Sequence, residues 1–189
     1  MLEWLLSIDR ALFQLVNSNG VPFLDPFFLL LSAKATNVVV YLGVAVLVAR
    51  KKHWSFFLSV LLTVGLMIAF TDQVTNLFKF GLERLRPCHE PVFKDSVRLV
   101  KESCGGLYSF FSGHASNSFA LATFFSCFLK RHQRKGGGLL FILAALIALS
   151  RVYLGVHYPL DIFCGALFGL FSGGLFWILG QKVGLPYVK

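Results

Sequence analysis

Long apolar runs are the feature of this sequence that most restricts how the chain can fold. Several runs reach roughly 18 residues or more, which is the length at which an α-helix crosses a bilayer. Of the 189 residues, 56% are hydrophobic and only 14% are charged, whereas a soluble domain is about a quarter charged. The sequence therefore predicts one all-α integral membrane domain over residues 1–189, folded as a polytopic helix bundle.

Polar segments divide the apolar runs into five expected spans. The first is the weakest because Lys34 and Asn37 interrupt it, and it is expected either as one span or as a short helix followed by a span. The fourth is short, so it is expected to tilt or to continue into Arg151. The expected ranges are 26–49, 54–78, 112–129, 137–152 and 159–180.

Residues 3–17 show a different pattern, in which polar side chains recur at steps of three and four. This pattern predicts an amphipathic helix that lies in the headgroup layer rather than a span. No basic leader precedes the segment, so we expect no cleavable signal peptide. The expected polar face consists of Glu3, Ser7, Arg10, Gln14 and Asn17.

Positive charge is concentrated in short connecting segments. A net charge of +9 would suggest nucleic acid in a soluble protein, but short loops with uncompensated lysine and arginine are typical of the cytoplasmic side of membrane proteins. We therefore expect no nucleic-acid partner and place residues 79–111 and 151–158 on the external side. The basic groups are Arg50, Lys51 and Lys52, then residues 130–135, then Lys182 and Lys189.

Three polar clusters lie on this predicted external side, each at the edge of an apolar run. Together they supply three permanent cations, two imidazoles and one carboxylate, and all three are expected to meet at one site. They are Lys79-x6-Arg86-Pro87, Ser112-Gly113-His114 and Ser150-Arg151-x5-His157-x3-Asp161.

The cations of these clusters suit a bound phosphate group. Lys79, Arg86 and Arg151 can neutralise its charge, and arginine offers two parallel hydrogen bonds to phosphate oxygens. Ser112 and Gly113 begin a predicted span from outside, so their backbone amides are expected to face the ligand from a helix N-terminus. These five residues are the predicted phosphate-binding set.

The two histidines supply the reacting groups. Asp161 follows His157 by four residues and is expected to accept its ring N–H, which leaves the other ring nitrogen free to attack phosphorus. His114 is then expected to protonate the leaving oxygen and later to activate water. The predicted catalytic residues are therefore His157, His114 and Asp161.

Other functions fit the same residues less well. Two facing histidines suit haem ligation, but three nearby cations argue against it. A zinc site built from Cys88, His89, His114 and His157 lacks the compact ligand spacing of such sites. A transporter that binds a phosphate or phospholipid without cleaving it would use the same cations and is the main alternative.

A polar stripe indicates which face of one span turns inward. Asp72, Asn76, Lys79 and Glu83 recur at helical spacing, and charged side chains within a bilayer face the bundle interior. Alternatively, Asp72 and Lys79 only neutralise each other. In the last span, Gly165, Gly169 and Gly173 are predicted to allow close packing against another helix.

The cysteines agree with this topology. Cys88 and Cys104 fall on the predicted external loop, where a disulfide is permitted, although two free thiols are the alternative. Cys127 and Cys164 fall within apolar spans and are expected to act as small core side chains.

The three clusters together resemble the signature of the type-2 phosphatidate phosphatase family of membrane lipid phosphatases, whose superfamily includes the vanadium haloperoxidases. That signature reads Lys-x6-Arg-Pro, Pro-Ser-Gly-His and Ser-Arg-x5-His-x3-Asp. The matching segments, within residues 79–161, are KFGLERLRP from Lys79, FSGH from Phe111 and SRVYLGVHYPLD from Ser150. Phe111 replaces the usual proline, a departure that removes no catalytic group.

The resemblance implies a metal-independent phosphatase with no cofactor, a phosphohistidine on His157, acid–base catalysis by His114 and orientation by Asp161. It also implies a six-helix core, so five to six transmembrane helices are expected, with residues 3–17 or a split of the 22–49 region supplying the extra one. A haloperoxidase-like enzyme that holds vanadate is a further alternative, which a membrane-embedded site makes less suitable.

The implied partners are the lipid bilayer and a membrane lipid phosphate or diphosphate. Undecaprenyl diphosphate is the favoured substrate, with phosphatidate, phosphatidylglycerophosphate and lipid A as the other candidates. The expected location is a bacterial inner membrane, with the active site facing the periplasm or exterior. The sequence gives no oligomeric state.

Overall fold

The computed structural model describes residues 2–49, 52–92 and 94–188, and this part of the chain is helical and contains no named strand. The prediction of an all-α fold is therefore confirmed. Of the predicted basic groups, Arg50, Lys51 and Lys189 lie outside the described residues. The α-helices are α1 (Leu2–Ser18), α2 (Asp25–Ser32), α3 (Lys34–Ala49), α4 (Trp54–Leu82), α5 (Gly113–Arg131), α6 (Gly137–Tyr153) and α7 (Pro159–Val183), and the short 3-10 turns are η1 (Pro22–Leu24), η2 (Pro87–His89), η3 (Lys94–Ser96) and η4 (Pro186–Val188).

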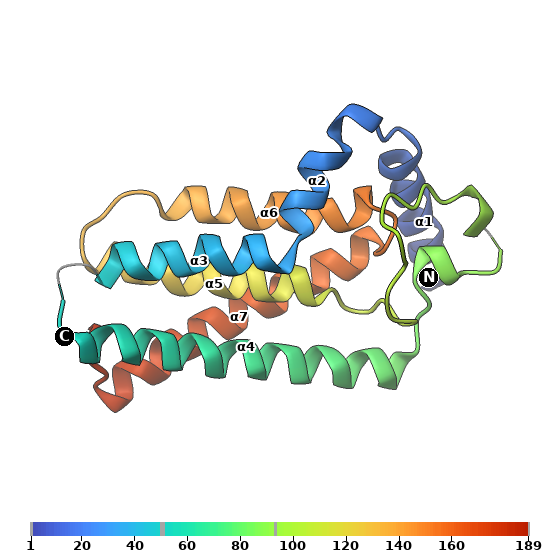
Figure 1. Cartoon of the computed structure of the whole chain (residues 1–189). Coiled ribbons are helices and arrows are strands. Elements are labelled where there is room, and N and C mark those ends of the chain that lie inside the picture. The colour runs from blue at the N-terminus through green and yellow to red at the C-terminus, as the bar shows by residue number, and fades with distance from the viewer. Residues whose placement is uncertain (1, 50–51, 93, 189) are drawn as a thin grey trace.

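Helix α5 lies at the centre of the bundle, where it contacts α3, α4, α6 and α7. Figure 1 shows these five helices running side by side, with α1 and the 83–112 segment gathered at one end and the C-terminus at the other. Helix α1 packs on α6 and α7. The chain segments that carry the three predicted clusters therefore meet at the α1 end of the bundle.

Two of the described helices, α4 and α7, are long and apolar enough to cross a membrane. The η1–α2 segment and α3 form a third candidate if this pair, bent by 57°, is counted as one span, while α6 is a shorter apolar helix. The predicted ranges of the spans match the positions of these helices, but the predicted number of five to six spans is not established by their length and composition.

The first predicted span is divided into two helices, which confirms the expectation of a short helix followed by a span. Helix α2 ends at Ser32, and Ala33 adopts an extended backbone before α3 begins at Lys34. The Asn37 side chain donates to the Leu31 and Ala33 carbonyls at 2.9 Å each. A polar residue that weakens the apolar run thus satisfies backbone acceptors that the bend exposes.

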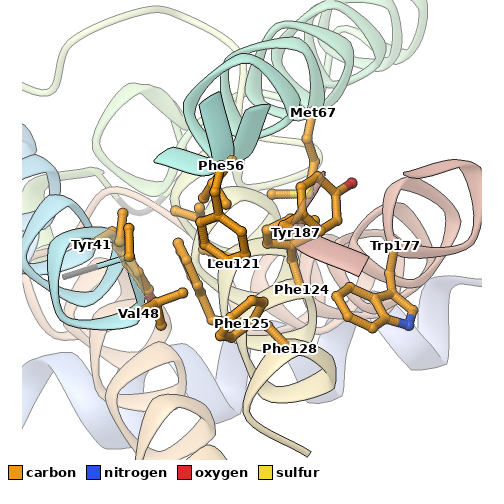
Figure 2. Close-up of a cluster of buried hydrophobic side chains, with 14 of the residues drawn as sticks. Tyr41, Val48, Phe56, Met67, Leu121, Phe124, Phe125, Phe128, Trp177 and Tyr187 are labelled. Carbon is orange, nitrogen blue, oxygen red and sulfur yellow. The ribbon is translucent and has the colours of Figure 1, made fainter. Parts of the chain in front are cut away.

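Aromatic side chains from α5 form the centre of the apolar core (Figure 2). Phe124 contacts Trp177 of α7 and Tyr187 of η4, with ring centroids 6.0 and 5.5 Å apart. Phe128 contacts Phe56 of α4 at 5.7 Å. The aromatic centre of this core lies in the half of the bundle away from α1.

Helix α1 buries a different face from the one that amphipathicity predicts. Its buried residues are Asp9, Phe13 and Asn17, whereas Trp4 and Leu15 are each 63% exposed. Asn17 was expected on the polar outer face, but it is fully buried and donates to the carbonyls of Arg98 and Tyr153. The apolar side of α1 is left for lipid, and Glu3, Ser7, Arg10 and Gln14 of the predicted polar face are exposed as well, so the buried face is a narrow stripe between the two.

The glycines of α7 lie directly against α5, which confirms their predicted packing role. A Cβ atom on Gly169 would lie 2.4 Å from the Ser116 carbonyl oxygen, and one on Gly173 would lie 2.4 Å from that of Ala120. Backbone atoms cannot move aside as a flexible side chain does. By contrast, Gly174 on the same helix has no neighbour within 4 Å of such a Cβ atom.

We therefore expect Gly169→Ala to destabilise the protein by about 1–3 kcal/mol, because overpacking forces two helices apart. Gly174→Ala is the matched control and should leave stability nearly unchanged. Thermal unfolding of both variants in detergent measures the difference, and equal midpoints would contradict the packing role of Gly169.

Candidate active site

A cavity of about 790 Å³ reaches the end of the bundle where the predicted site residues lie. It falls in the size range of ligand-binding pockets. Its walls come from α3, α4, α5, α6 and the segments that precede α5 and α7. It brings together six of the predicted site residues, namely Lys79, Arg86, Gly113, His114, Arg151 and His157.

His157 lies in the turn between α6 and α7, with Asp161 behind it. The His157 Nδ1 atom is 3.3 Å from Asp161 Oδ2, and the exposed fractions of the two side chains are 2% and 0%. Pro159 begins α7, and the Tyr158 N–H donates to Asp161 Oδ2 at 2.9 Å in a capping arrangement. The capping bond fixes the carboxylate, which in turn orients the imidazole ring.

Burial lowers the pKa of His157 well below its usual value, and the charges of Arg151, Arg86 and Lys79 lower it further. A hydrogen bond with the Ser109 backbone opposes this shift without reversing it. The ring is therefore neutral at physiological pH, which is the protonation state that a nucleophilic imidazole needs.

Arg86 is held by the loop that the cysteines close. Cys88 and Cys104 are joined as a disulfide, with Cα atoms 6.1 Å apart. Arg86 Nη1 donates to the Cys104 carbonyl at 2.6 Å, and Nε donates to that of Tyr108 at 3.2 Å. Gly105 has a φ of +78°, and a Cβ atom there would lie 3.1 Å from Arg86 Nη1. The loop is thus shaped around the guanidinium group.

Ser32, at the break between α2 and α3, contacts two site residues. Its hydroxyl accepts a hydrogen bond from Arg151 Nη1, and its carbonyl oxygen lies 3.1 Å from His114 Nε2. Arg151 is 4% exposed, and its Nε atom has no hydrogen-bond partner within the described part of the chain. This buried donor at the cavity wall is suited to an anionic ligand.

Ser112 does not reach the cavity, unlike its neighbour Gly113. The Ser112 N–H donates to the Asp161 carbonyl at 3.0 Å, and its hydroxyl caps α5 by accepting from the Ala115 N–H at 3.5 Å. The contact of Ser112 with phosphate therefore stays a prediction, and in this arrangement its amide already bonds α7. Gly113 lines the cavity beside Thr75 and Asp72.

The polar stripe of α4 faces the cavity over most of its length. Asp72, Asn76 and Lys79 line it, whereas Glu83 ends the helix in a left-handed conformation. Asp72 accepts a hydrogen bond from Asn117 Nδ2 at 2.8 Å. Among the described residues, no ion pair within 4.0 Å joins Asp72 and Lys79. The interpretation that they only neutralise each other is therefore not supported.

Phe111, which replaces the usual proline of the resembled signature, packs away from the cavity. Its ring lies 5.2 Å from those of Phe78 and Phe168, and the side chain is 4% exposed. The aromatic residue therefore fills space between α4 and α7. Cys127 and Cys164, expected in the core, are only half-buried.

Sequence reasoning missed four residues of the site and its surroundings. Ser32 lies in an apolar helix end, and Lys34 and Lys101 line the cavity although neither belongs to a cluster. Arg84 lies inside the first cluster at a position that the spacing leaves unspecified, yet it forms ion pairs with Asp9 and Asp161. Only Lys34 gave a signal, as a charge that interrupts an apolar run.

Comparison with known proteins places this arrangement in a family. The profile of the PAP2 superfamily matches residues 60–184. A lipid A 4'-phosphatase of Bacteroides thetaiotaomicron is 35% identical over 187 residues, which is 97% of this chain and 81% of that protein. YbjG of Escherichia coli, named as an undecaprenyl-diphosphatase, is 29% identical over 94% of this chain and 87% of its own length.

A solved structure shows the same fold. The phosphatidylglycerolphosphate phosphatase of Bacillus subtilis superposes with a TM-score of 0.71 at 24% identity, covering 95% of this chain and 87% of its own. The chain thus belongs to the PAP2 superfamily. It is an integral membrane protein and a phosphoric ester hydrolase of the lipid phosphatase class.

The disulfide removes one of the other interpretations. Cys88 is bonded to Cys104, so its thiolate is not free to join His89, His114 and His157 as a zinc ligand. Zinc coordination by cysteine requires the free thiolate.

Opening the disulfide is expected to weaken substrate binding, because the Cys104 carbonyl then ceases to hold Arg86. We expect KM to rise by roughly tenfold, the effect of loosening one charge-assisted hydrogen bond, in a Cys88→Ser/Cys104→Ser variant. Cys127→Ser, which removes a cysteine that forms no disulfide, is the control. Steady-state kinetics with and without a reducing agent provide the measurement, and a KM that responds to neither change would contradict this role of the loop.

Proposed function

We propose that the protein cleaves the terminal phosphate from a membrane lipid phosphate or diphosphate through a phosphohistidine on His157, at the external face of the membrane. The observation that carries the proposal is the buried His157–Asp161 pair facing a cavity that also holds Lys79, Arg86 and Arg151. A transporter that only binds a phosphate or phospholipid needs the cations but not the oriented imidazole. The His157–Asp161 pair therefore argues against that alternative function.

In the first chemical step, a ring nitrogen of His157 attacks phosphorus. An N–P bond forms while the bond between phosphorus and the lipid oxygen breaks, and His114 gives its proton to that oxygen. Asp161 stabilises the positive charge that develops on the imidazole ring. Lys79, Arg86 and Arg151 neutralise the oxygens of the phosphoryl group as it is transferred.

In the second step, water attacks the phosphohistidine. His114 accepts a proton from the water molecule, an O–P bond forms, and the N–P bond to His157 breaks. The products are inorganic phosphate and the neutral His157 ring, so the enzyme returns to its starting state. The Ser32 carbonyl, 3.1 Å from His114 Nε2, holds that ring at the cavity wall during both steps.

The shape of the cavity supports a lipid substrate. Beyond the charged end, its lining is apolar and includes Leu42 and Ala45 of α3, Val64 of α4 and Phe125 of α5. Lys79 and Val64 are 15 residues apart on α4, which corresponds to about 22 Å along a helix. An acyl or isoprenoid chain can follow this wall while its phosphate remains beside His157.

The charge distribution supports an external site in a bacterial inner membrane. Lys52, Lys130 and Lys182 belong to the ends of α4, α5 and α7 that lie away from the cavity (Figure 1). Uncompensated basic loops favour the cytoplasmic side, so the cavity would open to the periplasm or exterior. A disulfide beside the cavity also suits that compartment.

For the lipid, we propose lipid A with a 4'-phosphate ahead of undecaprenyl diphosphate. The lipid A 4'-phosphatase is the more similar of the two relatives over nearly the whole chain. Lys34 and Lys101 also line the cavity. They add two cations to the three that are proposed to bind the reactive phosphate. Burial and the charges of Arg151, Arg86 and Lys34 lower the pKa of Lys101. A substrate with a second phosphate would relieve this crowding of positive charge.

The covalent mechanism predicts that His157→Ala abolishes release of inorganic phosphate from a lipid phosphate in excess EDTA. The variant should retain the thermal stability of the native protein and its binding of vanadate, because the cations are unchanged. Rapid quenching of the native enzyme with ³²P-labelled substrate in alkaline detergent, where the acid-labile N–P bond survives, should trap labelled protein that His157→Ala lacks. Full activity in His157→Ala, or no trapped label, would contradict the intermediate.

The substrate proposal predicts the highest kcat/KM on bisphosphorylated lipid A in a panel with undecaprenyl diphosphate and phosphatidate. Lys101→Ala should raise KM by roughly tenfold for the two substrates with a second phosphate. It should leave phosphatidate, with one phosphate, nearly unchanged. An exposed lysine at the opposite end, Lys182→Ala, is the matched control. Equal effects on all three lipids would exclude a second-phosphate contact.

A further inference from the structure

Arg84 lies between two buried carboxylates that come from opposite ends of the sequence. Its Nη1 atom donates to Asp161 Oδ1 at 2.8 Å, and its Nη2 atom donates to Asp9 Oδ2 at 2.5 Å. The exposed fractions of the two aspartates are 5% for Asp9 and 0% for Asp161. The guanidinium group therefore links α1 to the residue behind His157.

Asp9 is itself fixed from two directions. Besides Arg84, its Oδ1 atom accepts a hydrogen bond from the Leu160 N–H at 2.7 Å, in the first turn of α7. An acidic side chain at this point also interacts favourably with the positive end of the helix dipole. Asp9 thus sets the position of Arg84 relative to the turn that carries Asp161.

Arg84 and the His157 ring contact different oxygens of the Asp161 carboxylate. Arg84 occupies Oδ1, which leaves Oδ2 for the Tyr158 N–H and the His157 ring. Arg84 also lies over the Tyr158 ring, 4.1 Å from its centroid, a distance suited to a cation–π contact. Because both oxygens have donors, the plane of the carboxylate cannot rotate away from His157.

Arg84 also has a charge that favours the ionised form of Asp161. Burial by itself would lower the pKa of Arg84, but Asp161 and Asp9 outweigh burial and raise it. The guanidinium group is therefore a permanent cation beside a carboxylate that must stay ionised to stabilise an imidazolium ring.

We propose that Arg84 and Asp9 are positioning residues for the reaction, which hold Asp161 ionised and aligned so that it can orient His157. The inference rests on the proposed function in one respect, namely that His157 is the nucleophile. It makes α1 part of the support of the active site, although this helix lies about 70 residues before the first motif. Arg84 and Asp9 do not line the cavity, whereas Arg86 and Lys79 do. Neither of the two proposed positioning residues is therefore placed to contact the phosphate.

The test separates alignment from general stability by comparing kcat, KM and the pH profile. Arg84→Gln is expected to lower kcat by about 10- to 100-fold, as small misplacements of reacting groups do. KM should stay nearly constant because Lys79, Arg86 and Arg151 are untouched. The acid limb of the kcat/KM profile should move up by about one to three pH units, since Asp161 loses its nearest cation.

Asp9→Asn gives a second variant with a different signature. The amide oxygen can still accept from the Leu160 N–H, but the charge that anchors Arg84 is lost. We expect a smaller fall in kcat and no upward movement of the acid limb, because a negative charge near Asp161 has been removed. Gln14→Ala, an exposed change on the same helix, is the control and should match the native enzyme.

A double-substitution cycle tests whether Arg84 acts through Asp161. Combined with Asp161→Asn, Arg84→Gln should cost little further activity, whereas independent roles would multiply the two losses. The groups that also influence this carboxylate are Lys79, Arg86, His157, Tyr158, Cys164 and Asp9. They are unchanged in Arg84→Gln, so the pH shift reports on Arg84.

The proposal is overturned if folded Arg84→Gln and Asp9→Asn both keep native kcat and pH profiles, or if the losses in the cycle multiply. Should Arg84→Gln fail to fold, Arg84→Lys replaces it: this variant keeps the charge, so it should lower kcat without moving the acid limb, and native kcat in both it and Asp9→Asn would overturn the proposal. A native enzyme that releases no phosphate from any lipid would contradict the proposed function instead. The two failures are therefore distinguishable.

Discussion

The buried carboxylate of Asp161 is the constraint on which the site end of this protein depends. An ionised carboxylate without solvent costs several kcal/mol unless donors surround it. Here three donors come from two segments: Arg84 after α4, and the His157 ring and the Tyr158 N–H in the turn before α7. The backbone carbonyl of Asp161 adds a fourth link by accepting from the Ser112 N–H at the start of α5. The hydrogen bonds that Asp161 accepts thus bring together the segments that carry all three clusters.

Charge is separated across the His157 ring. On the cavity side lie Lys79, Arg86 and Arg151, while Asp161 lies on the buried side. Cations gathered in a low-dielectric pocket repel one another and attract an anion strongly. The same field keeps His157 neutral, and in the proposed mechanism the carboxylate behind it stabilises the charge that attack on phosphorus creates. In that mechanism, substrate binding and nucleophile activation follow from one arrangement of charges.

Much of this arrangement could be predicted from spacing alone. The Lys79–Arg86 and Arg151–His157–Asp161 intervals gave the site, and the interruption at Lys34 and Asn37 gave the divided span. The bond from the Ser112 amide to α7 could not be predicted, because a helix start provides several amides and the sequence does not show which of them already bonds another helix. Arg84 and Asp9 escaped notice because their ion pair joins residues 75 positions apart.

The buried stripe of α1 shows why hydrophobic periodicity has limits in a membrane protein. In water, an apolar stripe marks the face that packs on the core, but lipid is as apolar as a protein interior. Periodicity then identifies the lipid-facing side as readily as the buried one. In α1, Trp4 and Leu15 are exposed, and so are Arg10 and Gln14 of the predicted polar face. The pattern therefore did not reveal the buried stripe, which mixes polar Asp9 and Asn17 with apolar Phe13.

Helices α1 and α2 explain how the long loop between α4 and α5 can hold Arg86 in place. Asn17 bonds both the N–H and the carbonyl of Arg98, and the Arg98 side chain forms an ion pair with Asp25 at 2.6 Å. Together with the Cys88–Cys104 disulfide, these contacts fix the loop at two points on either side of η3. Neither short helix supplies a residue to any of the three motifs. Their contribution is to tie the loop and, through Asp9, the Asp161 carboxylate to the bundle, so that the phosphate site is rigid before a lipid enters it.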